Sequence, residues 1–300
     1  MKKLLSMLLA LSVAMVSFAG CSQNQGTQSS SGADTGSSET SQTESESTDS
    51  NTEAGDDSLQ KIKDKGELIL GLDDSFPPMG FRDTDNNIVG YDIDLAKEVA
   101  KRMGVKLVIT PVDWDYKETE LNDGNVDCIW NGMSVDDERK EKMNLSEPYM
   151  ENRQVVVVLS DSGINTLADL AGKSVILQAG STAVGALDSK EDVKSTLKEV
   201  TEVPDNVQAM MELGQGTGDA VVMDEVVARY YISKSDNPDQ FKILDEVLSE
   251  EVYAIGFRKA DQALRDEVQK ILGEMKADGT LKEITETWFG SDISIVPDNE

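Results

Sequence analysis

The sequence contains no histidine, the residue that most often serves as a general base and as a zinc ligand. It has only two cysteines, Cys21 and Cys128, so a scaffold built on several disulfides is excluded. Basic residues are also few, since 28 Lys and Arg stand against 57 Asp and Glu and give a net charge of −29. A chain this acidic repels nucleic acid. We therefore expect no nucleic-acid partner, no metal and no cofactor.

The N-terminus has the layout of a secretory signal. Lys2 and Lys3 precede an uncharged apolar run over 4–19, which is too short to span a membrane comfortably. The run ends in Phe18-Ala19-Gly20-Cys21, which resembles a bacterial lipobox with Phe18 in place of the usual Leu. We predict a signal peptide over 1–20 and lipidation of Cys21. The alternative is an ordinary signal peptide beside a chance cysteine.

Residues 22–57 consist mainly of Ser, Thr, Gln, Gly and eight acidic residues, with no Lys, Arg or aromatic residue. Such a segment cannot bury enough apolar surface to offset the entropy of ordering. It predicts a disordered acidic stalk over 21–57 that holds a folded domain away from the membrane. A stalk of this kind suits an envelope without a periplasm. We expect the protein on the extracellular face of a Gram-positive-type cell membrane, as a monomer.

Residues 58–300 alternate short apolar runs with amphipathic stretches, which indicates an α/β fold with parallel strands. One stretch, 92–103, places apolar residues on one helical face and ends at Gly104. A second alternating set follows Pro148, so we predict two lobes: 58–155 with 253–300, and 156–252. The long apolar strands 155–158 and 252–257 are expected to cross between the lobes. Helices over 261–277 and 281–288 are expected to pack back on the first lobe.

Four segments in this order resemble the polar amino-acid binding proteins of ABC importers, the family of the histidine, lysine/arginine/ornithine and glutamine binders. They are Gly71 to Met79 with Gly90 to Ala96, Ile129 to Arg139 with Ser146 to Tyr149, Gln178 to Thr182, and Met223 to Glu225. The resemblance covers nearly all of 60–290. It implies a two-lobe periplasmic-binding-protein-like (type II) fold with two crossover strands, and a ligand bound between the lobes.

A site for a free amino acid must neutralise a carboxylate. Arg139 suits this task because guanidinium makes two parallel charge-assisted hydrogen bonds. Its charged surroundings, 136–142, would by themselves favour a solvated helix, whereas the resemblance implies a carboxylate contact. Ser181 and Thr182 follow a predicted strand and open a helix, as an ordinary turn also would. The resemblance makes Thr182 the carboxylate contact from the second lobe.

The same site must neutralise an ammonium group. Asp224 directly follows the apolar strand 220–223, at the strand end where ligands gather in open α/β sheets. A helix N-cap is the alternative role, and the resemblance implies pairing with the α-ammonium. Ser134 matches a position that holds the ligand's polar end, although it also suits an N-cap. Asn131 and Gly132, in the same segment, are further expected contacts.

Phe76 and Trp114 match positions whose side chains sandwich the ligand, and both lie in turn-rich surroundings. Core packing is the alternative for each. Asp73 matches an aspartate that meets the side-chain cation in binders of basic amino acids, although the adjacent Asp74 could take its place. Trp130 and Asn131 depart from the small or hydroxyl residues of the histidine-type proteins, which leaves the ligand's side chain open.

These features predict a substrate-binding lipoprotein of an amino-acid ABC importer. It would capture a polar or basic amino acid, or cystine, and deliver it to the permease, while the transporter's ATPase supplies energy. Closure would be a shift toward the state in which the ligand contacts both lobes. The alternatives are a cyclohexadienyl or arogenate dehydratase-like enzyme on the same fold, and an amino-acid sensory module. We predict no catalytic residue.

Overall fold

The computed structural model describes residues 55–299. The predicted signal peptide, Cys21 and nearly all of the predicted stalk lie outside the described residues. Their proposed roles stay predictions.

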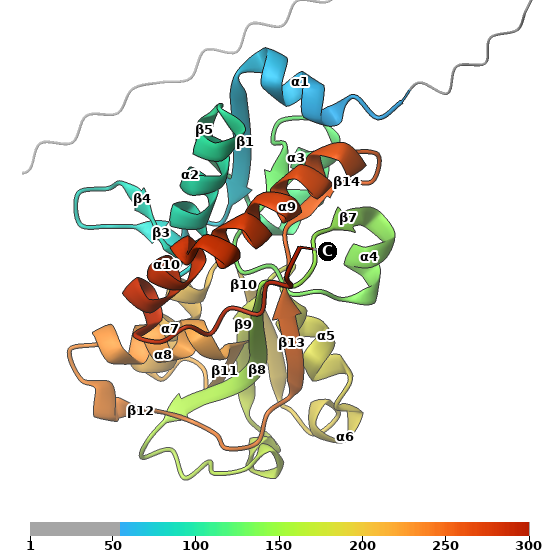
Figure 1. The fold of residues 1–300 in the computed structure, drawn as a ribbon. Coiled ribbons are helices and arrows are strands. Elements are labelled where there is room, and N and C mark those ends of the chain that lie inside the picture. The colour runs from blue at the N-terminus through green and yellow to red at the C-terminus, as the bar shows by residue number, and fades with distance from the viewer. Residues whose placement is uncertain (1–54, 300) are drawn as a thin grey trace, which may run out of the picture. The chain divides into compact units, whose positions relative to one another are not determined.

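The first lobe is built on a five-stranded sheet (Figure 1). Its strand order is β5 (Lys106–Pro111), β1 (Glu67–Leu72), β6 (Cys128–Ile129), β14 (Gly256–Arg258) and β7 (Met143–Leu145). Strand β1 pairs in parallel with β5 and β6, whereas β14 is antiparallel to both of its neighbours. A small sheet of β2 (Ser75–Phe76), β3 (Gly80–Arg82) and β4 (Ile88–Val89) extends from this lobe.

The second lobe contains a six-stranded sheet. Its order is β10 (Glu199–Val203), β9 (Ser174–Gln178), β11 (Ala220–Asp224), β8 (Met150–Leu159) and β12 (Phe241–Ile243), with β13 (Ser249–Tyr253) also paired to β8. Strand β9 is parallel to β10 and β11, and β8 is antiparallel to all of its partners. The predicted α/β fold is confirmed, with sheets that mix both strand directions.

The chain passes between the sheets twice, within 146–149 and at 254–255 (Figure 1). The prediction that 155–158 forms the first crossing is wrong, because these valines pair with β11 along their whole length inside the second sheet. Their lack of alternation reflects burial on both faces rather than passage between lobes. The second predicted crossing, 252–257, contains the end of β13 and the start of β14. The predicted lobe limits at 155 and 253 stay a prediction.

Helices cover the faces of both sheets. The first lobe carries α1 (Ser58–Lys65), α2 (Tyr91–Met103), α3 (Lys117–Asn122), α4 (Asp137–Lys142), α9 (Gln262–Asp278), α10 (Thr280–Phe289) and the 3₁₀ turn η1 (Trp114–Tyr116). The second carries α5 (Thr182–Asp188), α6 (Glu191–Lys194), α7 (Asn206–Gln215), α8 (Glu225–Lys234) and the turns η2 (Leu167–Leu170) and η3 (Pro238–Gln240).

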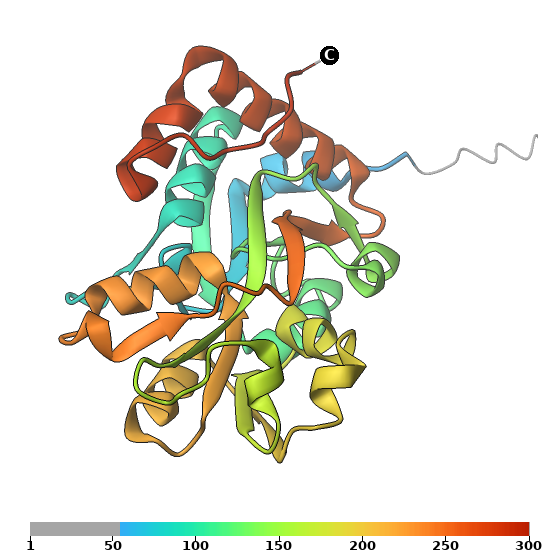
Figure 2. The same ribbon diagram turned by 90° about the horizontal axis from the view of Figure 1, so that it is seen from below.

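Local sequence explains the limits of helix α2. Its apolar face is buried, as the periodicity predicts, and the N–H of Gly104 caps its end by donating to the carbonyl of Ala100. The terminal helices α9 and α10 pack beside α2, which confirms the predicted return to the first lobe (Figure 1 and Figure 2). A hydrogen-bond contact of 3.1 Å between the hydroxyls of Tyr91 and Thr285 joins α2 to α10.

Cys128 is free and buried, as its apolar neighbours predict, and burial raises the pKa of its thiol. Within residues 55–299 no helix is both long and apolar enough to cross a membrane. In the same range, no group of three or more Cys, Asp or Glu side chains is arranged to hold a metal ion.

Candidate ligand-binding site

The side chains predicted to bind ligand meet where the two lobes face each other. Asp73, Phe76, Trp114, Asn131, Ser134, Arg139 and Asp224 are all buried there, and Ser181 and Thr182 are half-buried. The lobes touch in several places around this point. As contacts of a bound ligand these residues stay predictions, but the fold does gather them in one place.

Arg139 lies on α4, whose residues are all charged. It is buried, whereas the other residues of this helix are exposed. Its Nη1 donates to the carbonyl of Ser134 at 2.6 Å, and its Nη2 donates across the lobes to the carbonyl of Gly180 at 3.1 Å. The solvated-helix alternative is therefore wrong for this side chain. Burial lowers the pKa of the guanidinium, although Asp136 and Asp224 oppose the shift.

Lys117, which the sequence analysis did not select, supplies a second buried cation. Its Nζ donates to the carbonyls of Trp114 and Gly180, both at 3.0 Å, and lies 4.9 Å from the centre of the Trp114 ring. Burial and the nearby Arg139 lower the pKa of Lys117 to about 8. Two cations on the first lobe thus share one carbonyl of the second lobe, that of Gly180. We call Lys117 and Arg139 the cation pair.

The backbone conformation at position 180, and its close approach to the first lobe, require a glycine there. Its φ is +66°, and a Cβ built on it would lie 2.9 Å from the Cα of Asp115 on the opposite lobe. Any larger residue would hold the lobes apart. The Gly180-Ser181-Thr182 turn therefore sets how closely the lobes approach, besides any role in ligand binding. The hydroxyl of Ser181 donates locally, to the carbonyl of Gln178 at 2.7 Å.

Asp224 ends strand β11, where it pairs with Gln154 of β8 and lies near Tyr253 of β13. Its Oδ1 accepts hydrogen bonds from Asn152, from Gln154 Nε2 at 2.9 Å and from the hydroxyl of Tyr253 at 3.1 Å. Asp224 occupies the N-cap position of α8, as the alternative predicts, but its side chain makes no capping hydrogen bond there. Burial, and then the charge of Glu251, raise the pKa of Asp224 to about 7.

Glu251, on β13, is the second acid of the site and was also missed. Its Oε2 accepts from Ser134 Oγ at 2.6 Å and from Thr182 Oγ1 at 3.1 Å, so it links the two lobes. The same oxygen accepts from Gln154 Nε2 at 3.1 Å and from Asn152 Nδ2 at 3.2 Å. We call Asp224 and Glu251 the acid pair. Ser134 does not cap a helix, because α4 is capped by Asp136.

Asp73 lies at the far end of the site. Its Oδ1 accepts from the backbone N–H of Ser75 at 2.9 Å, and its Oδ2 accepts from Gln178 Nε2 across the lobes at 2.7 Å. Burial raises the pKa of Asp73. Asp74 instead pairs with Arg82 at 2.6 Å on the surface. The structure thus selects Asp73 rather than Asp74 as the acid that faces the second lobe.

The remaining predicted residues pack around these charges. Asn131 Oδ1 accepts from the N–H of Asp73 at 3.1 Å, which fixes the backbone before the Asp73 side chain. Gly132 has φ +54°, and a Cβ there would lie 2.9 Å from the Phe76 ring, so only glycine lets the ring lie this close. Trp130 belongs to the core of the first lobe and packs edge-on against Tyr149.

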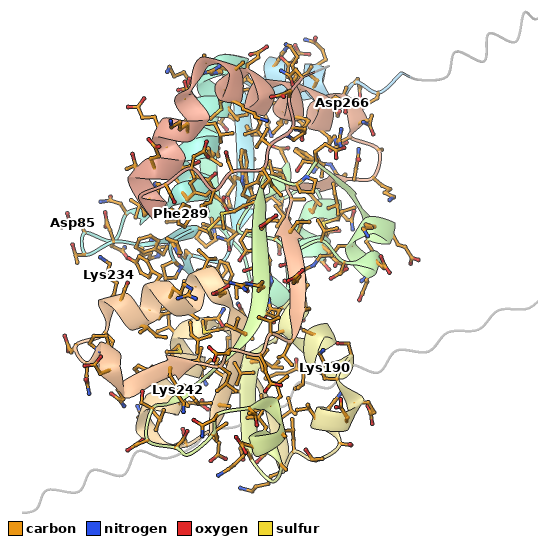
Figure 3. All side chains as sticks on the ribbon, turned by 60° about the horizontal axis from the view of Figure 1, so that its bottom comes forward. Asp85, Lys190, Lys234, Lys242, Asp266 and Phe289 are labelled. Carbon is orange, nitrogen blue, oxygen red and sulfur yellow. The ribbon has the colours of Figure 1, made fainter. Side chains whose placement is uncertain are left out.

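A groove of about 1100 Å³ also borders this region, but it is a separate feature. It is lined by β8, β13, α8 and the end of α10, and includes Glu251, Asn152, Arg229 and Phe289. Figure 3 shows β8 and β13 side by side between the lobes, with Phe289 at the end of α10. The predicted ligand residues Arg139, Thr182 and Asp224 do not line it. Only Asn152 and Glu251 belong to both the groove and the acid pair's surroundings.

Two α/β lobes joined by two crossings, with opposite charges buried between them, define a two-lobed ligand-binding protein. The described residues 68–291 match the family model of bacterial extracellular solute-binding proteins, family 3. The chain belongs to this family.

Relatives in this family share most of the chain. The sequence is 30% identical over 238 residues to the L-cystine-binding protein TcyJ of Escherichia coli, covering 79% of this chain and 87% of the relative. It is 33% identical over 228 residues to the arginine-binding extracellular protein ArtP of Bacillus subtilis, covering 75% and 87%. A solved substrate-binding protein of an ABC uptake transporter from Streptococcus pneumoniae, with bound histidine, superposes with a TM-score of 0.78. That structure is 34% identical and aligns over 80% of this chain and 99% of its own.

Proposed function

We propose that this protein is the substrate-binding component of an amino-acid ABC importer. It captures a polar or basic amino acid, or cystine, between its lobes and delivers it to the permease. The observation that carries the proposal is the arrangement of buried charge: the cation pair lies on the first lobe and Asp224 lies on the second. A zwitterion needs partners of both signs, and burial strengthens both interactions. The names of the relatives favour the same class of ligand.

The ligand would act by joining the lobes. Arg139 and Phe76 belong to the first lobe, whereas Thr182 and Asp224 belong to the second. A ligand that contacts all four binds the closed state better than the open one, so binding shifts the population toward closure. The permease would then recognise the closed surface, and the ATPase partner would drive transport.

Acids outnumber cations in the site when the half-buried Glu251 is counted with the buried charges. Asp73, Asp224 and Glu251 stand against Lys117 and Arg139. A net negative site favours a ligand whose overall charge is zero or positive over one with an acidic side chain. Asp73 is the expected partner for a cationic or polar side chain.

We also propose that the protein is held at the extracellular face of the cell membrane by lipid on Cys21, with the acidic stalk as spacer. The support is the sequence alone, namely the apolar run, the small residues before Cys21 and the stalk composition. Metabolic labelling with a lipid precursor, compared between the wild type and Cys21→Ser, tests it. Equal labelling of both proteins would refute the anchor.

The decisive experiment for ligand binding compares Arg139→Ala with Lys140→Ala, an exposed neighbour on the same helix. A thermal-shift screen of wild-type residues 55–300 against single amino acids identifies a ligand, because a ligand that binds only the folded state raises its stability. Calorimetry should then show affinity lost by at least about 100-fold in Arg139→Ala, since a buried charge loses its partner. Lys140→Ala should bind as the wild type does.

Unchanged affinity of Arg139→Ala would contradict the proposed site. We assign no catalytic role, because the relatives compared above are named as binding proteins. A dehydratase assay with prephenate-like substrates tests the enzyme alternative, and turnover would overturn our assignment.

A further inference from the structure

Glu251 lies inside β13, the strand of the second sheet that directly precedes the second crossing between the lobes. Strand β13 runs beside β8, and Glu251 pairs in register with Asn152. Its carboxylate is half-buried and reaches Ser134 on the first lobe and Thr182 on the second. The resemblance assigns Ser134 to the polar end of the ligand and Thr182 to its carboxylate. A side chain of the protein itself thus contacts them both.

The contact with Glu251 limits the hydrogen bonds that the hydroxyls of Ser134 and Thr182 can make to a ligand. A serine or threonine hydroxyl has a single proton to donate and two lone pairs. Both protons point to Glu251 Oε2, and Thr182 Oγ1 also accepts from Gln154 Nε2 at 3.3 Å, so one lone pair of Thr182 Oγ1 and two of Ser134 Oγ remain for other partners. With Glu251 in place, the two hydroxyls accept hydrogen bonds and do not donate them to a carboxylate.

The other polar groups nearby also offer acceptors. Asn152 and Gln154 spend their amide protons on the acid pair, and their buried oxygens, Oδ1 and Oε1, have no hydrogen-bond partner within residues 55–299. Across the same residues, neither Asp224 nor Glu251 forms an ion pair with a lysine or arginine. One of these adjacent carboxylates is buried and the other half-buried, and their repulsion is only partly offset by the charge of Arg139. The cluster therefore suits a group that carries both positive charge and several N–H donors.

The donors suited to a carboxylate lie instead with the cation pair. Lys117 Nζ makes two hydrogen bonds of its three, and Arg139 reaches the same carbonyl of Gly180. The acid pair and the cation pair thus differ in charge. They also differ in hydrogen bonding, because the surroundings of the acid pair offer acceptors and the cation pair offers donors.

We propose that Glu251 is a specificity-determining residue. It turns the hydroxyls of Ser134 and Thr182 into acceptors for the ligand's ammonium group, and the carboxylate is left to Arg139 and Lys117. The inference rests on the proposed function and adds to it: the ligand class is a primary amine with a carboxylate, and strand β13 takes part in recognising the amine.

The test compares Glu251→Gln with Glu250→Gln, which removes the same charge from the exposed neighbour on the same strand. Wild-type protein is screened by calorimetry against L-arginine, L-histidine, L-glutamine and L-cystine, and the best binder is kept as the probe. We expect Glu251→Gln to bind this probe about 10- to 100-fold more weakly, the size of a lost hydrogen bond to a charged group. Glu250→Gln should not change the affinity.

A second probe separates recognition from support of the fold. The α-hydroxy acid analogue of the same probe lacks the ammonium, and its affinity is measured by displacement at millimolar concentration. Glu251→Gln should leave the affinity for this analogue unchanged, whereas Lys117→Met should weaken both probes. Equal weakening of both probes in Glu251→Gln would overturn the inference, because it would indicate a structural role.

Tighter or unchanged binding of the amino acid by Glu251→Gln would also overturn the inference, since Glu251 would then compete with the ligand's carboxylate or take no part. Failure of the wild type to bind any of the four amino acids would instead refute the proposed function, and the inference with it. The two failures are therefore distinguishable.

Discussion

Asp92 and Asp224 are two buried aspartates with the same pKa behaviour and different surroundings. Both are buried, and burial is the main cause that raises each pKa to about 7. Asp92 accepts from the N–H of Gly132 at 2.6 Å and from the hydroxyl of Tyr149 at 3.0 Å. Asp224 accepts only from side chains and lies beside a second acid, Glu251.

The difference shows that a raised pKa does not by itself mark a binding residue. Asp92 lies in the first turn of α2 and ties this helix to Gly132, before α4, and to Tyr149, in the first crossing between the sheets. Asp224 lies at the interface of the lobes, with acceptor atoms in excess around it. We infer that Asp92 stabilises the first lobe, whereas Asp224 is reserved for a cationic group of the ligand.

The largest expected effect is on ligand binding by Asp224→Asn. Loss of the carboxylate removes the partner of a buried ammonium, so affinity should fall by about 3 kcal/mol, or about 100-fold. Calorimetry with the best-binding amino acid measures this loss. The unliganded protein should melt at the same temperature or higher, because the repulsion from Glu251 is gone. A variant that binds normally would show that Asp224 resembles Asp92 in role.

A smaller effect is expected on stability in Asp92→Ala. The N–H of Gly132 would lose its acceptor at 2.6 Å and keep only the longer contact of 3.2 Å to the hydroxyl of Tyr149, which should lower the free energy of unfolding by about 2 kcal/mol. Urea unfolding measures the change. Asp92→Asn is the matched control, because its amide oxygen can still accept from Gly132 and Tyr149. Equal destabilisation by both variants would mean that charge, rather than the hydrogen bonds, matters at this position.

The smallest effect is a pH dependence that belongs to Asp224 and not to Asp92. The pKa of Asp224 in the unliganded protein is about 7, and an ammonium ligand binds its ionised form. Affinity should therefore fall as the pH drops below 7, by at most about tenfold per pH unit. Titration calorimetry from pH 8 to 5.5 would measure it. Asp224→Asn should lose this dependence, and Asp92→Asn should keep it.

The raised pKa also makes the stability of the unliganded protein depend on pH, but in the opposite direction: stability falls as the pH rises, whereas affinity for the ligand increases. A carboxyl whose pKa is raised from 3.8 to about 7 binds a proton more tightly when folded. The stabilisation linked to that proton is present below about pH 4 and is lost as the pH rises through 7. Both Asp92→Asn and Asp224→Asn should flatten the melting temperature between pH 5 and 8. A flat profile in the wild type would argue against the raised pKa of either group.

Much of the fold could be predicted because local patterns record local environments. The apolar face of α2 and the alternation of strands with helices follow directly from the sequence. The prediction that 155–158 crosses between the lobes was wrong for the same reason. An uninterrupted apolar run indicates burial on both faces, but it does not tell which sheet contains the strand. The site was predictable where a motif marks it, as at Arg139.

The sequence by itself determined the acidic, histidine-free composition, the two sets of α/β elements and the ordered segments that hold Asp73, Arg139, Thr182 and Asp224. Only the tertiary structure decided that Asp73 rather than Asp74 faces the second lobe, and that Lys117 and Glu251 join the site. The physical reason is distance along the chain. Ser134 and Glu251 are 117 residues apart, and the direction of a hydroxyl proton between them depends on how the lobes close. Periodicity and composition describe each segment alone, whereas hydrogen bonding across the lobes depends on both at once.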